Sequence, residues 1–460
     1  MSTARTTIVL TLSLMCAAVA GGRERPGDGP STPHDPSLDA EAELQILIDK
    51  YLDRYLTVHP VSATRLGDHR FDDRWPDPSA EAEFAWSVEV RVYRGKLENA
   101  RIGVVSPYDR VDAEILAHHL ESTLFSADEL RPWETNPLAA VGTVGSGLDY
   151  LVSRNYAPLD ERLTKLEARL LGLPAFLEAA RGRLDTPARI HTETAIQQNR
   201  GLINFVEGSL RSDFAEVPDR QVALETAVEV ALAALKAHQA FLEDELLPRS
   251  TGDFRLGPER FERKLAFALN TKLGPDQVVA RAEALLEKTT DEMARIATEL
   301  HPAVLGAPAP PTPDDASRAV LIRAVLDQLA ADHPDDDTLL DEARATLAEA
   351  TQFVADRGLV AMPDEPVEII EMPEFNRGVS IAYCDAPGPF EKSRETFYAI
   401  APPPADWPEE RRESFYREYN SWMLVDLTIH EAMPGHYLQL AHAGKVHRPL
   451  RAVFSSGTFV

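Results

Sequence analysis

The feature that most constrains this chain is the spacing of its apolar residues. Between residues 40 and 356 they recur at intervals of three and four, which places them on one face of an α-helix. In the first such segment this face consists of Leu44, Leu47, Ile48, Tyr51, Leu52 and Tyr55, and His59-Pro60 ends the helix. Further amphipathic helices are predicted at about 79–104, 109–126, 158–183, 190–212, 218–246, 275–300, 315–333 and 337–356. A chain with this pattern is expected to be mainly α.

A short region after residue 360 has a different pattern. Val367–Glu371, Ser380–Tyr383 and Thr396–Ile400 are rich in β-branched and aromatic residues, which favours strands. A last long helix is predicted from about Pro408 towards Ala441. The sequence therefore predicts a large helical domain with a small β-sheet next to its last helix.

The first residues are typical of an export signal. Arg5 precedes an apolar run from Ile8 to Ala18, and the small residues around Ala20 suit signal cleavage. The run is too short to span a membrane. We expect a signal peptide at residues 1–20, a flexible leader at 21–37 and the folded domain at 38–460.

The two cysteines bear on localisation and on stability. The residues before Cys16 do not follow the usual order of a lipid-attachment site, so a periplasmic or extracellular protein is favoured over a lipoprotein. If Cys16 leaves with the signal peptide, Cys384 is alone and forms no internal disulfide. A large apolar core must then stabilise the domain.

The charge of the chain limits its partners. The formal net charge is −27 and no segment forms a basic patch, so binding to nucleic acid is not expected. No stable association with a membrane is expected either, and the sequence gives no indication of the oligomeric state.

One segment, residues 428–439, concentrates the residues that carry chemistry. It contains His430 and Glu431, followed by His436. Two histidines on one helix face and an adjacent Glu are typical of zinc hydrolases, in which the imidazoles bind the ion and the Glu activates water. Those histidines are four residues apart, about 40° around the helix. Here they are six apart, and a regular helix would separate them by about 240°.

Pro434 and Gly435 offer a way to restore the geometry. Pro434 has no N–H for the carbonyl of His430, and its ring collides with that carbonyl, so the helix must open. Gly435 tolerates the unusual backbone that follows. We hypothesise a two-residue bulge that lets His436 take the place of the second ligand. The alternative is that Pro-Gly simply ends the helix and that the three residues occur together by chance.

The segment His-Glu-Ala-Met-Pro-Gly-His-Tyr-Leu-Gln resembles a bacterial family catalogued as domain of unknown function 885, whose mark is H-E-x-x-P-G-H-x-x-Q. Residues 55–67, 256–261 and 386–398 also resemble parts of that family, so the resemblance covers roughly residues 40–460. The family is grouped with zinc peptidases of the gluzincin type. These are helical enzymes with a small sheet by the active site.

The resemblance implies roles for individual residues. His430 and His436 become zinc ligands, Glu431 the general base, and Gln439 a residue that braces His436. The ordinary alternative for Gln439 is an exposed side chain without a role. The implied reaction is hydrolysis of a peptide bond by a zinc-activated water, with Glu431 passing the proton to the leaving amine.

The rest of a peptide site is less defined. The strand expected at Thr396–Ile400 could align an extended peptide by edge pairing. Tyr383, Tyr398 and Tyr437 are candidates to donate to the oxyanion, with ordinary packing as the alternative.

The chain departs from the family at the third ligand. Gluzincins take a Glu from a later helix, and similar family sequence continues into a Glu-Gly-Trp segment. None of the residues from Tyr437 to Val460 is Asp or Glu. We therefore expect a C-terminal truncation that binds zinc weakly and is inactive without the missing part. His442 or His447 as third ligand is a weaker alternative.

Two other functions are open to this sequence. One is a non-catalytic relative that binds a peptide or a partner at an incomplete metal site. The other is a Cys384 nucleophile working with His430, although the residues around Cys384 do not resemble a cysteine-hydrolase signature.

We predict that the native gene continues past Val460 and encodes a Glu within the next few residues, on a helix facing His430 and His436. The stretch without acidic residues after the motif motivates this expectation. Sequencing the native gene tests it, and a stop codon directly after Val460 would contradict it.

Overall fold

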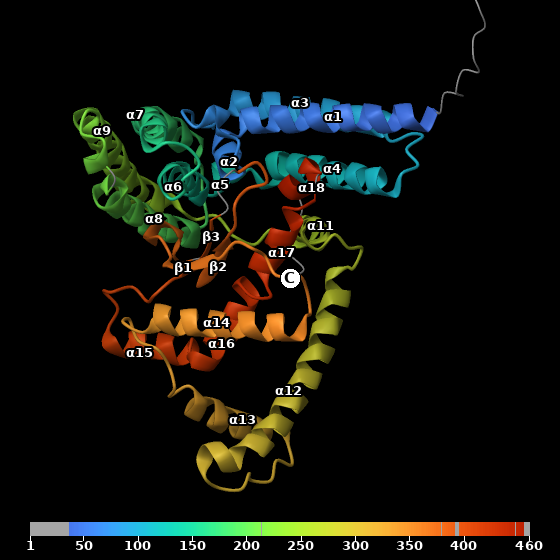
Figure 1. Ribbon diagram of the computed structural model, residues 1–460, viewed down its shortest axis with the longest axis vertical. Coiled ribbons are helices and arrows are strands. Elements are labelled where there is room, and N and C mark those ends of the chain that lie inside the picture. The colour runs from blue at the N-terminus through green and yellow to red at the C-terminus, as the bar shows by residue number, and fades with distance from the viewer. Residues whose placement is uncertain (1–35, 213, 379, 392–394, 447, 455–460) are drawn as a thin grey trace, which may run out of the picture.

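The amphipathic segments form helices that lie on both sides of a small sheet (Figure 1). The computed structural model describes residues 36–454 except 213, 379, 392–394 and 447. The expected signal peptide and all but the last two residues of the expected leader lie outside these ranges. The first helix begins at Pro36, slightly before the expected start of the domain.

The helices are α1 (Pro36–Val58), α2 (Pro60–Arg65), α3 (Ala80–Ala100), α4 (Pro107–Phe125), α5 (Pro132–Thr135), α6 (Leu138–Val152), α7 (Leu159–Arg183), α8 (Arg189–Glu207), α9 (Gln221–Ala240), α10 (Leu247–Arg249), α11 (Pro258–Leu269), α12 (Pro275–Leu305), α13 (Asp315–Leu329), α14 (Leu339–Arg357), α15 (Glu409–Glu418), α16 (Ser421–Glu431), α17 (His436–Ala443) and α18 (Pro449–Phe454). The strands are β1 (Val367–Glu371), β2 (Ala382–Asp385) and β3 (Thr396–Ile400). The prediction of a mainly α domain with a small sheet is confirmed. No helix in the described ranges is both long enough and apolar enough to cross a membrane.

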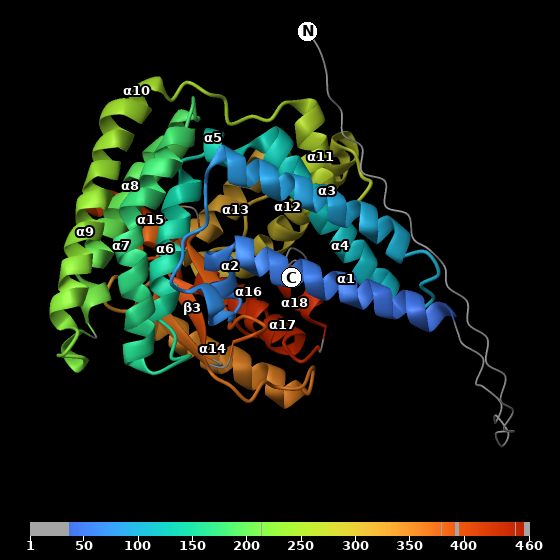
Figure 2. The ribbon, with the colours of Figure 1, turned by 90° about the horizontal axis from the view of Figure 1, so that it is seen from above.

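The three largest apolar cores join most of these elements. The largest lies within the bundle of α6 to α9, which Figure 2 shows side by side, and includes Leu148, Leu170 and Leu235. A second core joins α1, α3 and α4 to α18 through Leu450. The third packs the sheet against α14, α15 and α16, with Tyr398 of β3 fully buried.

The sheet has the order β1-β3-β2, with β3 parallel to β1 and antiparallel to β2. The suggestion that Thr396–Ile400 offers an edge to a peptide is therefore wrong, because β3 is the central strand and both of its edges are paired. Among the described residues, β2 pairs with β3 alone, so its other edge is free. α16 packs against β2.

Helix α6 was not anticipated from the sequence. Its glycines lower helix propensity, but two of them meet large side chains from elsewhere in the chain. A Cβ at Gly145 would lie 2.4 Å from the ring of Phe375, and one at Gly147 would lie 2.4 Å from the ring of Trp75. These close approaches require glycine. The single long helix expected from Pro408 is also wrong, because that region forms α15, α16 and α17.

A buried arginine links α7 to α2 and α6. The Arg169 side chain is fully buried and donates from Nη2 to the hydroxyl of Thr64, at 2.6 Å, and from Nη1 to the carbonyl of Gly147. The Thr64 hydroxyl also lies 2.6 Å from Oδ1 of the fully buried Asp72. This contact places a carboxylate near the buried guanidinium, which such a cation needs for stability.

The network continues to the loop that follows β2. Asp72 Oδ2 accepts from the Tyr156 hydroxyl, at 2.7 Å, and from His69 Nδ1, at 2.8 Å. His69 Nε2 lies 3.0 Å from a carboxylate oxygen of Glu391. Burial alone lowers the pKa of His69, but its bonds to the two carboxylates outweigh this effect and raise it to about 9. Protonated His69 therefore clamps the residues after α2 to the loop between β2 and β3.

This clamp predicts a pH dependence of stability. The pKa of His69 is raised above its ordinary value of 6.5, so the folded state binds more protons between pH 6.5 and 9. The stabilisation should be complete below about pH 6.5 and lost as the pH rises through about 9. We expect His69→Gln to lower the free energy of unfolding by about 2 kcal/mol at pH 6 and by much less at pH 10. Urea unfolding at both pH values measures this. His301→Gln is the control, since the partly exposed ring of His301 contacts a backbone carbonyl and no carboxylate among the described residues. Equal losses at both pH values would contradict the prediction.

Candidate metal centre

Helix α16 carries His430 and Glu431 at its C-terminal end. The helix is capped at its start by Asn420, whose side chain accepts from the N–H groups of Trp422 and Met423. It ends at Glu431, because the next two N–H groups both bond to the carbonyl of Thr428, at 2.9 and 3.2 Å. Pro434 has no N–H for the carbonyl of His430, so the helical hydrogen bonds cannot continue.

A four-residue turn, Ala432 to Gly435, joins α16 to α17, and the peptide between Met433 and Pro434 is cis. The hypothesis of a bulge within one helix is therefore wrong: one helix stops and a second starts at His436. The alternative that Pro-Gly ends the helix is correct for the backbone. Ala432 and Met433 are buried and fix the turn in the core, Met433 beside Val354 of α14.

Gly435 is required by the close approach of the two helix ends. A Cβ at this position would lie 1.8 Å from the carbonyl oxygen of His430. No side chain fits at that distance, so any substitution must push α17 away from the end of α16.

The turn brings the two imidazoles together. The ring centroids of His430 and His436 are 4.8 Å apart and the rings are perpendicular. His430, Glu431 and His436 each offer one ligand atom, and these atoms lie within 4.8 Å of one another. Two nitrogens bound to one tetrahedral zinc ion are about 3.4 Å apart. The donor set and its spacing therefore fit a zinc ion held by the two histidines.

Solvent reaches these three residues to different degrees. His430 is exposed, His436 is half-buried and Glu431 is only 8% exposed. Among the described residues, Glu431 has no hydrogen-bond or ion-pair partner. The largely buried position of this carboxylate beside two imidazoles makes it a candidate for a functional role.

Gln439 lies one turn after His436 on α17. Its Oε1 is 3.5 Å from Nδ1 of His436, which is longer than an ordinary hydrogen bond. The residue is thus placed where a bracing side chain would stand, without a tight contact in this state.

The other candidate ligands do not join the group. Nε2 of His442 lies 2.9 Å from the carbonyl oxygen of Ala361, which turns the ring to a different partner. His447 lies outside the described residues.

The three tyrosines are engaged in other contacts. The Tyr398 hydroxyl lies 3.4 Å from that of Thr428, and the Tyr383 hydroxyl accepts from Asn376 at 3.1 Å. The Tyr437 hydroxyl donates to the carbonyl of Glu365. These contacts agree with packing roles.

Cys384 faces the buried cluster that contains Met433 and Tyr437. Burial, together with the nearby charge of Glu431, raises the pKa of its thiol to about 12. The thiol is therefore protonated at neutral pH, which is unfavourable for a nucleophile.

Known proteins share the sequence pattern and the fold. Residues 60–460 match the family model described as "Bacterial protein of unknown function (DUF885)". No curated protein matches the chain. The structure is similar to that of a candidate lipoprotein of unknown function from Shewanella oneidensis, with a TM-score of 0.67, 27% identity, and coverage of 90% of this chain and 74% of that chain. For a candidate lipoprotein from Colwellia psychrerythraea these values are 0.66, 15%, 90% and 75%, a likeness that shows the fold alone.

The Gly435 contact yields a prediction about metal binding. Gly435→Ala should weaken zinc binding at least about tenfold, because the added Cβ must separate the helix ends that carry the two histidines. Competition with a chromophoric chelator measures the affinity, and circular dichroism checks folding. Gly444→Ala is the matched control, since a Cβ there makes only ordinary contacts, the nearest at 3.5 Å. Unchanged affinity in Gly435→Ala would show that the turn does not set the site.

Proposed function

This chain belongs to the bacterial family of unknown function that it matches over residues 60–460, and we propose that it is a zinc-dependent hydrolase of peptide bonds. The observation that carries the proposal is the convergence of His430, Glu431 and His436 within 4.8 Å. Zinc bound there would polarise the scissile carbonyl and make a water molecule more acidic. The remaining steps fall to side chains of this chain.

Glu431 has the properties of a general base. Its carboxylate is buried, stands beside the two imidazoles and has no competing partner among the described residues. It can therefore take a proton from water and pass it to the leaving amine. The two imidazoles would bind the ion through ring nitrogen lone pairs. Gln439 can fix the orientation of His436 if its Oε1 moves a few tenths of an ångström closer to Nδ1.

The substrate peptide would lie along β2. β1 and β2 are both edge strands, and β2 is the one that packs against α16, which carries the site. An extended peptide can form main-chain hydrogen bonds with such an edge. This role replaces the one first suggested for Thr396–Ile400.

We propose in addition that the protein is exported. The amino-terminal sequence supports this, and the similar structure from Shewanella oneidensis is of a candidate lipoprotein. Lipid attachment at Cys16 is the alternative to release after cleavage.

A second function is favoured by one observation. The described residues supply no third protein ligand besides Glu431, so a relative that binds peptides without cleaving them remains the alternative.

Two substitutions separate the base from the ligands. Glu431→Gln should retain zinc but reduce peptide cleavage at least about a hundredfold, because the shape is kept and the base is lost. His436→Ala should lose zinc and activity together, because it removes a ligand. Zinc content and hydrolysis of a mixed peptide library are measured side by side in each variant and in the parent protein.

Controls distinguish these effects from misfolding. Glu418→Gln, at an exposed position, and His301→Ala, at a partly exposed one outside the site, make the same chemical changes and should leave zinc and activity unchanged. Full cleavage by Glu431→Gln would refute the proposed mechanism. Full zinc retention by His436→Ala would exclude that residue as a ligand. A parent protein that binds peptides but cleaves none would favour the non-catalytic alternative.

A further inference from the structure

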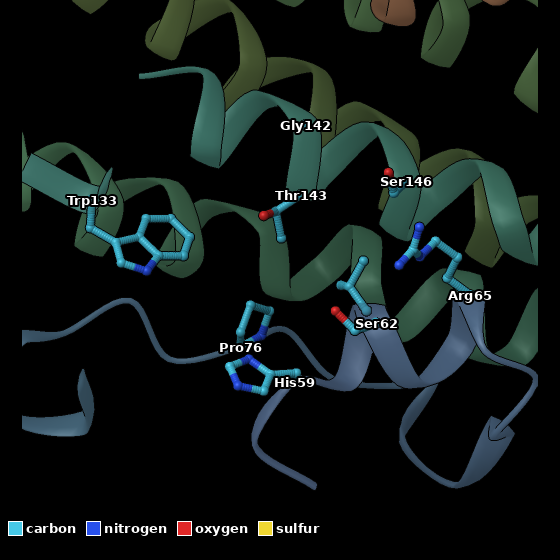
Figure 3. A pocket seen from close by; sticks show the side chains of 9 residues that line it. His59, Ser62, Arg65, Pro76, Trp133, Gly142, Thr143 and Ser146 are labelled. Atoms are coloured by element: carbon cyan, nitrogen blue, oxygen red, sulfur yellow. The ribbon is translucent and has the colours of Figure 1, made fainter. Parts of the chain in front are cut away.

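A second concave site lies between α2 and α6, apart from the two histidines. It is a cavity of about 330 Å³ lined by His59, Val61, Ser62, Arg65, Pro76, Trp133, Gly142, Thr143 and Ser146. Figure 3 shows Ser62 and Arg65 reaching from α2 towards α6, with Trp133 at the far end. A volume of this size suits a small ligand or one residue of a larger one.

Arg65 is the one charged side chain among these lining residues. The only other titratable group in the lining is His59, and burial lowers its pKa to about 4, so its ring is neutral at pH 7. Among the described residues the Arg65 guanidinium has no hydrogen bond and no ion pair. Its five N–H donors are thus available to a ligand.

The nearest candidate partner for Arg65 is already engaged. Asp385, at the end of β2, forms an ion pair with Arg154 at 2.7 Å and accepts from Tyr150 at 3.4 Å. Arg154 also donates to the carbonyl of Glu395. Arg65 interacts with Asp385 only through the Coulombic field, because the hydrogen bonds of this carboxylate go to Arg154 and Tyr150. The exposed guanidinium of Arg65 therefore keeps its N–H donors free for a ligand.

The walls of the cavity complete an amphipathic site. Near Arg65, the Ser146 hydroxyl has no partner among the described residues and can donate to an anion. Away from Arg65, the indole of Trp133 and the ring of Pro76 form an apolar end, as Figure 3 shows. Gly142 keeps the cavity open, since a Cβ there would meet no atom within 4 Å.

The cavity is connected to the sheet. The N–H of Phe390, in the loop after β2, donates to the carbonyl of Leu66 at 2.9 Å, directly next to Arg65. Glycines on both sides allow this approach: a Cβ at Gly67 or at Gly388 would lie within 2.5 Å of the facing backbone. Arg65 also interacts electrostatically with Asp385 at the end of β2, so a peptide along β2 would have Arg65 near one end of its path.

We propose that this cavity binds a carboxylate group of a peptide, either its C-terminus or the side chain of an Asp or Glu, through Arg65. The planar guanidinium pairs with carboxylates through two parallel hydrogen bonds, and the apolar end accepts the adjoining side chain. The inference rests on the proposed function only in taking a peptide as the carrier of the carboxylate.

Binding is tested in the full chain carrying Glu431→Gln, so that cleavage does not interfere. The probes are N-acetyl-phenylalanine with its amide, and N-acetyl-glutamate α-amide with N-acetyl-glutamine amide. Isothermal titration calorimetry should show that at least one acid binds about 10- to 100-fold more tightly than its neutral partner. The pair that discriminates identifies the source of the carboxylate.

Three variants locate the binding, and two serve as controls. Arg65→Gln should remove the preference for the acid, Arg65→Lys should restore part of it, and Gly142→Leu should fill the cavity and abolish binding. The matched controls are Arg94→Gln, an exposed arginine outside the cavity, and Gly182→Leu, a helical glycine with open space around it. Both should bind like the parent.

The outcomes are distinct from those of the proposed function. Equal affinity for acids and amides, no binding of any probe, or binding unaffected by Arg65→Gln or Gly142→Leu would overturn the inference. Arg65-dependent binding by a protein that never cleaves a peptide would support the inference and refute the hydrolase alone.

Discussion

The architecture depends on the hydrogen bonds and the nearby carboxylate that compensate the buried charge of Arg169. Arg169 is fully excluded from solvent, and a guanidinium in that position is costly unless hydrogen bonds and a carboxylate compensate it. Its contacts reach Thr64 of α2 and the backbone of α6, and Asp72 extends them to His69. The same helices, α2 and α6, form the walls of the Arg65 cavity. The walls of this cavity are thus held in place by a buried polar network.

Much of the helical architecture could be predicted because each long helix has one apolar face. α7, α12 and α14 need only that pattern, and their observed bounds agree closely with the prediction. α6 could not be predicted in the same way. Its glycines meet Trp75 and Phe375, which are distant in sequence, and only the tertiary structure shows that these contacts require small residues.

The sequence predicts which residues form the candidate site, but it does not predict the path of the backbone that joins them. The types and order of His430, Glu431 and His436 suggested metal chemistry directly. The backbone path between them depends on where α16 ends. That end is set by two hydrogen bonds to the carbonyl of Thr428, which local helix propensity does not reveal. Strand order was also out of reach, because pairing within a sheet is set by packing between segments and not by the pattern of one strand. The Arg65 cavity needs two helices to be placed side by side, so no single segment indicates it.

The break between α16 and α17 has a consequence for how an ion would be captured. In many small metal sites the ligand side chains are mobile before the ion binds. Part of the binding free energy is then lost to the conformational entropy of ordering them. Here a turn of four residues, fixed by buried Ala432 and Met433, keeps the second imidazole at a high effective concentration around the first. The conformational entropy of bringing the two histidines together is therefore lost during folding and not during metal binding. The affinity of the two histidines for a metal ion would therefore depend on the stability of the core beneath them. A substitution that destabilises that core would lower this affinity even though neither histidine is changed.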